Sequence, residues 1–169
     1  MNFYEVLRAR RSIRSFDRNR EIPEAALERI MKAVQCAPSA CNRQPWRFEI
    51  VFNPELREKI GACYPKDWLL QAPAIVVAMG DYSNCWKRLE GTPSVEIDIG
   101  IAMEHLVLAA TAEGLATCWV CAFEKARLNQ VMGVKDPWSV EAIAPLGYGT
   151  GAPHGLPYKP MEEIFKVRR

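Results

Sequence analysis

Hydrophobic residues recur at helical spacing in several parts of the chain. Leu27, Ile30, Met31 and Val34 follow an i, i+3, i+4, i+7 pattern, which places them on one face of a helix. Pro23 suits the first turn of that helix, because an N–H at this position would have no partner within the helix. Similar signals predict further helices at residues 3–9, from 53, at 94–113, at 124–132 and from 160.

Uninterrupted apolar runs predict the strands. Residues 72–79 read APAIVVAM, and such a continuous run is typical of a strand that is covered on both faces. We expect further strands at residues 48–52, 116–123 and 140–148. Residues 81–93 follow neither period, so we expect an exposed excursion there, of the kind that can serve as a lid.

The longest apolar stretch, residues 95–115, indicates a buried helix. A membrane span would seldom carry the five ionisable residues that interrupt it, which are Glu96, Asp98, Glu104, His105 and Glu113. The predicted helix at 94–113 is apolar around most of its circumference, which suits the core or a subunit interface. Gly114 is expected to end it in a left-handed conformation.

Composition limits the class of protein. The chain has 169 residues, of which 49% are hydrophobic and 25% charged, values that are ordinary for a globular protein and exclude wholesale disorder. The length fits a single domain over residues 1–169, or one protomer of an intertwined dimer. A net charge of +2 is too small to indicate nucleic acid or an anionic membrane as a partner.

The chain has six cysteines, Cys36, Cys41, Cys63, Cys85, Cys118 and Cys121. The N-terminus lacks a secretion-signal pattern, so we expect reduced thiols and a cytoplasmic location. Cys118 and Cys121 have the C-x-x-C spacing of a redox pair or of half a zinc site. However, they lie in an apolar run, there is no second such motif, and the only histidines are His105 and His154. Buried structural cysteines are therefore favoured, and no metal site is expected.

Residues 37–48, APSACNRQPWRF, form a loop that is polar and stiff at the same time. Its two prolines restrict the backbone, and the serine, asparagine, arginine and glutamine between them offer donors and acceptors. Such a loop suits recognition of a flat ligand with heteroatoms on its edge. An ordinary helix-to-strand connection is an equally good interpretation of these residues alone.

Residues 3–9 predict a short helix with Phe3, Val6 and Leu7 on one face, and residues 10–16 follow it with three arginines and two serines. Arginine forks and serine hydroxyls suit a phosphate group. Taken alone, a solvated basic helix end is the simpler interpretation.

Four segments, in this order, resemble the FMN-dependent nitroreductase family. They are Arg10-Arg11-Ser12-Ile13-Arg14; Ala37-Pro38-Ser39 with Asn42-x-Gln44-Pro45-Trp46-x-Phe48; Gly114-Leu115-Ala116-Thr117-Cys118-Trp119 with Ala122-Phe123; and Leu146-Gly147-Tyr148 with Lys159-Pro160-Met161-Glu162-Glu163. The resemblance spans nearly the whole chain. It implies an α+β fold with a mainly antiparallel central sheet flanked by helices, in an interlocked homodimer that binds FMN at its interface.

The resemblance also implies three groups of contacts to FMN. The phosphate would be held by Arg10, Arg11, Ser12 and Lys159, with assistance from Arg14. One flavin face would be lined by Pro38 and Ser39, and the flavin and ribityl edge would be bonded by Asn42 and Gln44. Backbone N–H groups near flavin N5 and O4 would come from Val120, Cys121 and Ala122.

Three positions depart from the family pattern. Lys159 stands where an arginine is frequent, which keeps the charge but loses the bidentate fork. Cys121 stands where many relatives have a small residue such as glycine, close to the expected flavin edge. Residues 149–151, Gly-Thr-Gly, replace a more usual proline.

By resemblance, the chain is an oxidoreductase with a ping-pong mechanism. NAD(P)H would reduce the flavin and leave, and a nitroaromatic, a quinone or a related small molecule would then accept the electrons in the same cleft. The flavin would carry the chemistry, so no catalytic side chain is expected. Two alternatives remain: a low-turnover flavin-binding carrier or sensor, and a thiol-redox protein that uses Cys118 and Cys121.

Overall fold

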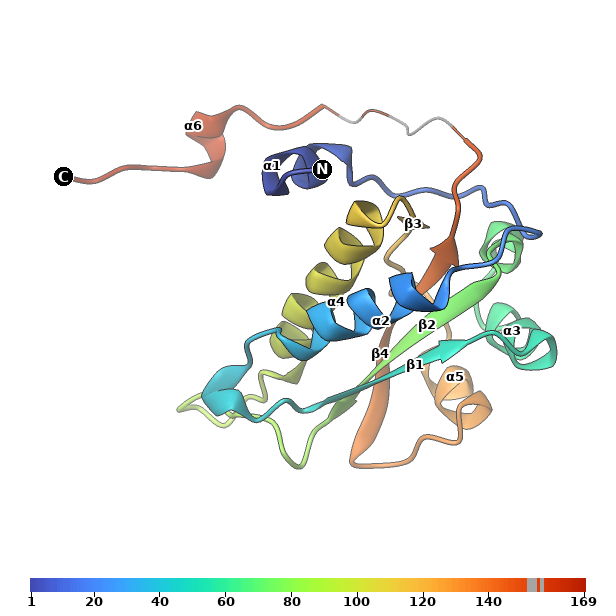
Figure 1. Ribbon diagram of the computed structural model, residues 1–169. Coiled ribbons are helices and arrows are strands. Elements are labelled where there is room, and N and C mark those ends of the chain that lie inside the picture. The colour runs from blue at the N-terminus through green and yellow to red at the C-terminus, as the bar shows by residue number, and fades with distance from the viewer. Residues whose placement is uncertain (152–154, 156) are drawn as a thin grey trace.

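The computed structural model describes residues 1–151, 155 and 157–169, so that His154 lies outside the described residues. Four strands form an antiparallel sheet in the order β1-β2-β4-β3 (Figure 1). They are β1 (Trp46–Val51), β2 (Ala74–Asp81), β3 (Ala116–Thr117) and β4 (Trp138–Gly147). The expected α+β class, with a mainly antiparallel sheet flanked by helices, is confirmed.

Helices cover both faces of this sheet (Figure 1). One face carries α2 (Glu24–Gln35) and α4 (Val95–Ala112), and the other carries α3 (Pro54–Gly61) and α5 (Lys125–Val131). Alternate residues of β2 divide between the two layers: Val76 packs with α2 and α4, whereas Ile75 and Val77 pack with α3 and α5. This double cover explains why β2 is apolar and buried from Ala74 to Gly80, as the apolar run in its sequence predicted. The remaining short elements are α1 (Phe3–Ala9), η1 (Ala40–Asn42), η2 (Asp67–Gln71) and α6 (Met161–Ile164).

The long helix α4 forms as predicted and ends at Gly114, whose φ is +74°. It is buried against the sheet through residues such as Ile99, Met103 and Leu106, while Ile97 stays exposed. None of the helices in the described part of the chain combines the length and the apolar character that a membrane crossing needs.

The predicted strand at 116–123 is wrong beyond Thr117. In the continued register Cys118 would face Pro145 of β4, and proline has no N–H to donate to the ladder. The chain therefore leaves the sheet and returns only at Val120, which forms an isolated bridge with Ile143.

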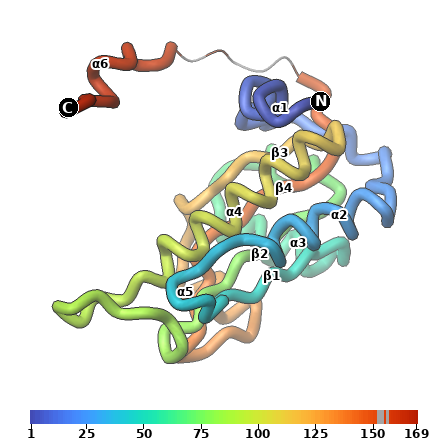
Figure 2. The backbone as a smooth tube through the Cα atoms, turned by 60° about the vertical axis from the view of Figure 1, so that its left-hand side comes forward, coloured from blue at the N-terminus to red at the C-terminus, as the bar shows by residue number. Residues whose placement is uncertain are grey.

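The expected inward face of α1 is also only partly correct. Val6 is buried, but Phe3 and Leu7 are exposed. The helix is held locally by a capping box between Asn2 and Glu5. The helix α1 lies at the margin of the molecule, beyond the two layers that cover the sheet (Figure 2). Only one narrow stripe of this helix therefore packs against other parts of the protein.

Candidate functional site

The basic segment, residues 10–16, follows α1 and lies against the end of β3. The N–H of Ile13 donates to the carbonyl oxygen of Thr117 at 2.9 Å, and Ser12 forms a parallel bridge with Thr117. A little further on, the N–H of Asp17 donates to the carbonyl oxygen of Tyr148 at 2.9 Å. The basic segment is therefore a neighbour of β3 and of the end of β4, although they are distant in the sequence. The resemblance assigns the basic segment and the residues that follow β3 to one ligand.

The basic segment lies next to the buried Cys118, because Ser12 pairs with Thr117, the residue before it. Burial raises the pKa of the Cys118 thiol, whose residue is 3% exposed, and the positive charges of Arg14 and Arg10 act in the opposite direction on this pKa. Arg14 also lies over the ring of Trp68, 5.8 Å from its centroid. Two guanidinium groups and a hydroxyl on one short segment suit a phosphate group.

Arg11 points elsewhere. Its Nη1 donates to the carbonyl oxygen of Arg8 at 2.6 Å and to that of Arg10 at 2.7 Å. These carbonyl groups belong to the C-terminal end of α1, where the helix dipole favours a positive charge. Arg11 therefore stabilises α1 in this structure rather than joining Arg10 and Arg14.

The segment after Cys118 carries the second predicted contact. The N–H and the carbonyl oxygen of Val120 both bond to Ile143, at 2.9 and 3.0 Å. Among the described residues, the N–H groups of Cys121 and Ala122 have no hydrogen-bond acceptor, and both residues are exposed. Of the three expected donors, Val120 is thus used within the fold, and the other two face outward.

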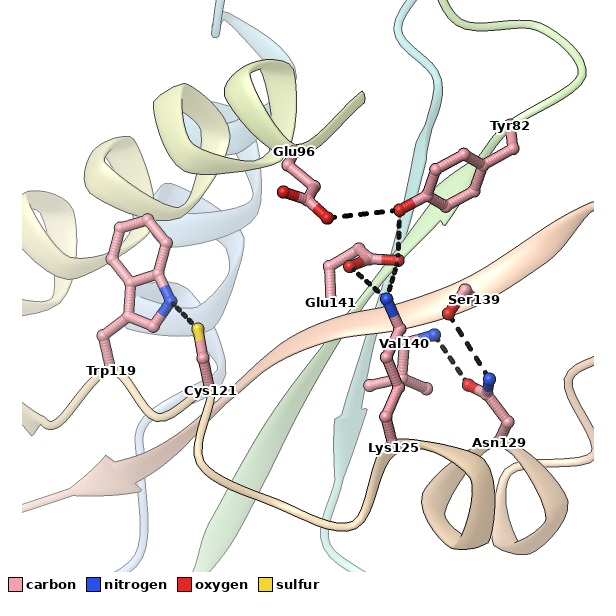
Figure 3. Close-up of polar contacts among 9 residues, drawn as sticks. All are labelled: Tyr82, Glu96, Trp119, Cys121, Lys125, Asn129, Ser139, Val140 and Glu141. Atoms are coloured by element: carbon pink, nitrogen blue, oxygen red, sulfur yellow. Dashed lines mark hydrogen bonds and ion pairs between the residues drawn. The ribbon is translucent and has the colours of Figure 1, made fainter. Parts of the chain in front are cut away.

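The two cysteines of the C-x-x-C motif occupy different environments. Cys118 is buried, as expected for a structural cysteine, but the same interpretation is wrong for Cys121, which is an exposed free thiol. Trp119 Nε1 donates to Cys121 Sγ at 3.2 Å (Figure 3). A set of three or more His, Cys, Asp or Glu side chains that could hold a metal ion is not found in the described parts of the chain.

The loop at residues 37–45 is held in an unusual backbone conformation. Cys41, Asn42 and Gln44 have φ values of 52°, 52° and 47°, a left-handed region that costs about 1–2 kcal/mol for a residue other than glycine. The Ser39 hydroxyl accepts the N–H of Gln44 at 2.8 Å, and Gln44 Nε2 donates to Asn42 Oδ1 at 2.9 Å. The predicted polar loop therefore holds hydrogen bonds within itself, from Gln44 to Ser39 and to Asn42.

Both ends of this loop are tied to other elements. Near its start, the N–H of Ala40 donates to Oδ1 of Asp98 in α4 at 3.0 Å. Near its end, Arg43 Nη1 donates to the carbonyl oxygens of Asn84 and Cys85, at 3.4 and 3.3 Å. The excursion that was expected at 81–93 therefore packs against the loop.

The basic segment and the loop lie at opposite ends of α4. The loop is bonded to the first turn of this helix, whereas β3 and the basic segment lie at its C-terminal end (Figures 1 and 2). With 18 residues, α4 is about 27 Å long. One copy of the chain therefore does not bring Ser12 and Ser39 around the same ligand.

A cavity of about 270 Å³ opens beside the exposed Cys121. It lies between the first turns of α4, the segment after Trp119 and β4, and it is lined by Glu96, Ile99, Trp119, Cys121, Phe123, Lys125, Glu141 and Ala142. The walls are mostly apolar and aromatic, with a few charged groups, which is the usual make-up of a small-molecule site.

The charged groups of this cavity form one network (Figure 3). The Glu141 side chain is only 7% exposed; its carboxylate accepts from Lys125 Nζ at 2.7 and 2.9 Å and from the Tyr82 hydroxyl at 3.0 Å. Burial, together with the nearby carboxylates of Glu141 and Glu96, raises the pKa of Tyr82, so its hydroxyl keeps its proton. Sequence reasoning missed this network. The one available signal was Glu141, a single charge in the apolar strand β4.

Lys159 lies on the exposed C-terminal segment, residues 157–169. This segment extends away from the layers of the fold, past α1 (Figures 1 and 2). The structure does not bring Lys159 to the basic segment of the same chain.

Comparison with known proteins gives a consistent result. The sequence model of the Nitroreductase family matches residues 7–64 and 60–148. A protein of Methanothermobacter thermautotrophicus named for NADH dehydrogenase/NAD(P)H nitroreductase is 32% identical over 156 residues, which cover 88% of this chain and 78% of that protein. The crystal structure of a nitroreductase family protein from Clostridium novyi NT is 32% identical, with a TM-score of 0.81, and covers 89% of this chain and 86% of that one. A structure from Exiguobacterium sibiricum, solved in complex with FMN, has a TM-score of 0.88 at 21% identity, with 99% and 98% coverage, and shows likeness of fold alone.

Proposed function

Because the chain belongs to the nitroreductase family, we propose that it is an oxidoreductase that binds FMN and takes electrons from NAD(P)H. Nitroaromatic compounds, quinones or related small molecules receive the electrons in a ping-pong sequence. The relative named for NADH dehydrogenase/NAD(P)H nitroreductase supports the donor, and the FMN complex of a structural neighbour supports the cofactor. The observation that carries the proposal is the pairing of the basic segment with β3: Ser12 forms a bridge with Thr117, and Ile13 donates to it, just before the segment that leads to Cys121.

The residues present fit FMN. Its phosphate carries up to two negative charges, and Arg10 and Arg14 supply two guanidinium groups on either side of Ser12 in the basic segment. The outward N–H groups of Cys121 and Ala122 would then donate to the flavin edge, while Val120 fixes the segment to β4. Arg11 would join only by leaving the carbonyl groups of α1, so its contribution should be the smaller one.

When bound, the flavin supplies the hydride and electron chemistry. The protein's own residues bind and orient the reactants. The cavity beside Cys121 has room for a small aromatic ring. The paired charges of Lys125 and Glu141 lie in its wall, and the Tyr82 hydroxyl donates to Glu141. We place the electron acceptor at the mouth of this cavity, with the Cys121 side chain limiting its approach.

The active form is proposed to be a homodimer. A second copy can bring its loop at 37–45 to the basic segment of the first, which one copy cannot do alone. The C-terminal segment supports this, because it exposes several large apolar side chains, namely Tyr158, Met161, Ile164, Phe165 and Val167. Exposed apolar surface of this kind marks an association site. On a second copy, this segment would also carry Lys159 toward the phosphate.

Three measurements test the function. The purified chain should be yellow or become so on addition of FMN, and it should oxidise NAD(P)H faster when menadione or a nitrofuran is present. Initial rates at several NAD(P)H and menadione concentrations should give the parallel double-reciprocal lines of a ping-pong mechanism. Bound FMN without acceptor-dependent oxidation would indicate the carrier or sensor instead, and failure to bind FMN would contradict the proposal. Activity that persists without flavin and is lost on alkylation of Cys121 would indicate a thiol-redox protein.

A further inference from the structure

A buried acid lies behind the loop at residues 37–45. Asp98 is 2% exposed and stands in the first turn of α4, where the helix dipole favours a negative charge. Its Oδ1 accepts the N–H of Ala40 at 3.0 Å. Its Oδ2 is buried and has no hydrogen-bond partner among the described residues.

The bond from Ala40 joins the loop to the core at the point where the loop needs support. The next residues include Cys41 and Asn42 in the left-handed region, a conformation that persists only where the surroundings impose it. The ends of the loop are bonded to α2 and β2, through Ala37 to Val34 and through Pro45 to Asp81. Between these ends, the other bonds run within the loop or from Arg43 to the excursion at 81–93. Asp98 is thus the link between the left-handed part of the loop and α4.

We propose that Asp98 is a positioning residue that holds residues 38–44 in the conformation that contacts FMN. This inference rests on the proposed function. Asp98 touches no ligand itself; it acts through Ala40 on the neighbouring Pro38 and Ser39. Since only Oδ1 is used, the oxygen as an acceptor matters and the negative charge does not. An asparagine side chain retains that oxygen, whereas alanine removes it.

The test compares Asp98→Ala and Asp98→Asn with the wild-type chain, each stripped of flavin and titrated with FMN by fluorescence quenching. Asp98→Ala should raise the FMN dissociation constant about tenfold or more, because the N–H of Ala40 loses its acceptor and the loop relaxes. Asp98→Asn should stay within about threefold of the wild type. Asn53→Ala is the matched control, since Asn53 also accepts a backbone N–H, that of Leu56, but at α3. It should lower the unfolding temperature and leave the dissociation constant unchanged.

Two results would overturn the inference: an unchanged dissociation constant in Asp98→Ala, or an equal loss in Asp98→Asn. If Asp98→Ala does not fold, hydrogen exchange of the Ala40 amide decides. It should be slow in the wild type and in Asp98→Asn, and fast exchange in the wild type would contradict the bond.

A readout without flavin separates this inference from the proposed function. Trypsin should cleave after the exposed Arg43 faster in the Asp98→Ala apoprotein than in the wild-type or Asp98→Asn apoproteins. If the wild type binds no FMN, the proposed function fails, and the positioning role toward FMN fails with it. The cleavage pattern then still shows whether Asp98 anchors the loop. Equal cleavage in all three apoproteins would refute the anchoring role.

Discussion

In the proposed FMN site, the basic segment and the loop at 37–45 use different physical means to prepare for the ligand. The basic segment has no left-handed residue, and the long charged side chains of Arg10 and Arg14 are proposed to provide the recognition. At the loop the side chains are short and mostly uncharged, and the backbone itself is unusual, with left-handed residues held by Ser39 and Asp98. The attraction between a charged side chain and its ligand is screened by salt. A left-handed backbone, in contrast, depends on a few individual hydrogen bonds that hold it in place.

The largest expected effect comes from the charges. Arg10→Ala and Arg14→Ala should each weaken FMN binding by about 1.5–3 kcal/mol, because each removes a charged hydrogen bond to the phosphate, and the double variant should lose more. The loss should shrink as sodium chloride is added. Fluorescence titration at low and at high salt measures both effects. Arg8→Ala, on the exposed side of α1, serves as the control, and unchanged affinity in the double variant would remove the phosphate assignment.

The next largest effect on FMN affinity is expected from a change in the conformation of the loop. Ser39→Ala leaves the N–H of Gln44 without its acceptor, which should weaken FMN binding by about 1 kcal/mol. Unlike the arginine variants, it should show the same loss at every salt concentration. Ser83→Ala, which removes a hydroxyl from another exposed turn, should have no effect. If the loss of FMN affinity in Ser39→Ala depends on salt, the loop acts through charge as the basic segment does, and the two do not differ in the way described.

The pH dependence of stability tests the surroundings of the buried Cys118 thiol, which lies next to the basic segment. Burial raises the pKa of this thiol above its ordinary value of 9.0, so the neutral thiol stabilises the fold below that pH. As the pH rises past 9.0, the unfolded chain ionises first and this stabilisation is lost. Cys118→Ala should therefore be less stable than the wild type near neutral pH, by about 1 kcal/mol for the buried side chain that it truncates. Urea unfolding across the pH range should show this difference narrowing toward alkaline pH; a constant difference would contradict the raised pKa.

A smaller effect on FMN affinity is expected for Arg11 than for Arg10 or Arg14. Arg11→Ala should change FMN binding by no more than about 0.5 kcal/mol, but it should lower the free energy of unfolding by about 0.5–1 kcal/mol, because the carbonyl groups at the end of α1 lose their donor. Calorimetry and FMN titration on the same preparation measure the two quantities. A loss of affinity equal to that of Arg10→Ala would show that Arg11 turns to the phosphate when FMN is bound.

The smallest effect on FMN is expected for Cys121→Gly. The backbone N–H that faces the flavin edge survives the change, so affinity should stay the same, while the cavity beside it becomes wider. Turnover with a bulky quinone should rise relative to turnover with a small one. Cys118→Ala should leave this ratio unchanged, since its side chain is buried in the core and does not line the cavity. Equal ratios in Cys121→Gly and the wild type would mean that this side chain does not limit the acceptor.

Local periodicity was sufficient for the main elements. The pattern predicted α2 and the burial of Leu27, Ile30 and Val34, but Met31, at the edge of the same face, is exposed. The run at 72–79 predicted a doubly covered strand. Gly114 marked the end of α4, and its φ is positive. These features depend on residues a few positions apart, so the sequence pattern contains them.

Contacts between distant residues decided the rest. Whether the chain from 116 to 123 forms a strand depended on Pro145 across the sheet, which no local pattern around Cys118 reveals. The exposed face of α1 likewise followed from its place outside the layers (Figure 2).

The candidate site shows the same division. Its residue types and motifs could be read from the sequence, because arginine, serine and amide side chains suit phosphate and flavin wherever they lie. Their grouping could not, since three-dimensional proximity set it: Ser12 beside Thr117, Asp98 beneath Ala40, and Glu141 between Lys125 and Tyr82. The left-handed backbone of Cys41, Asn42 and Gln44 carries no glycine signal. Tertiary hydrogen bonds impose this conformation, so only the folded structure reveals it.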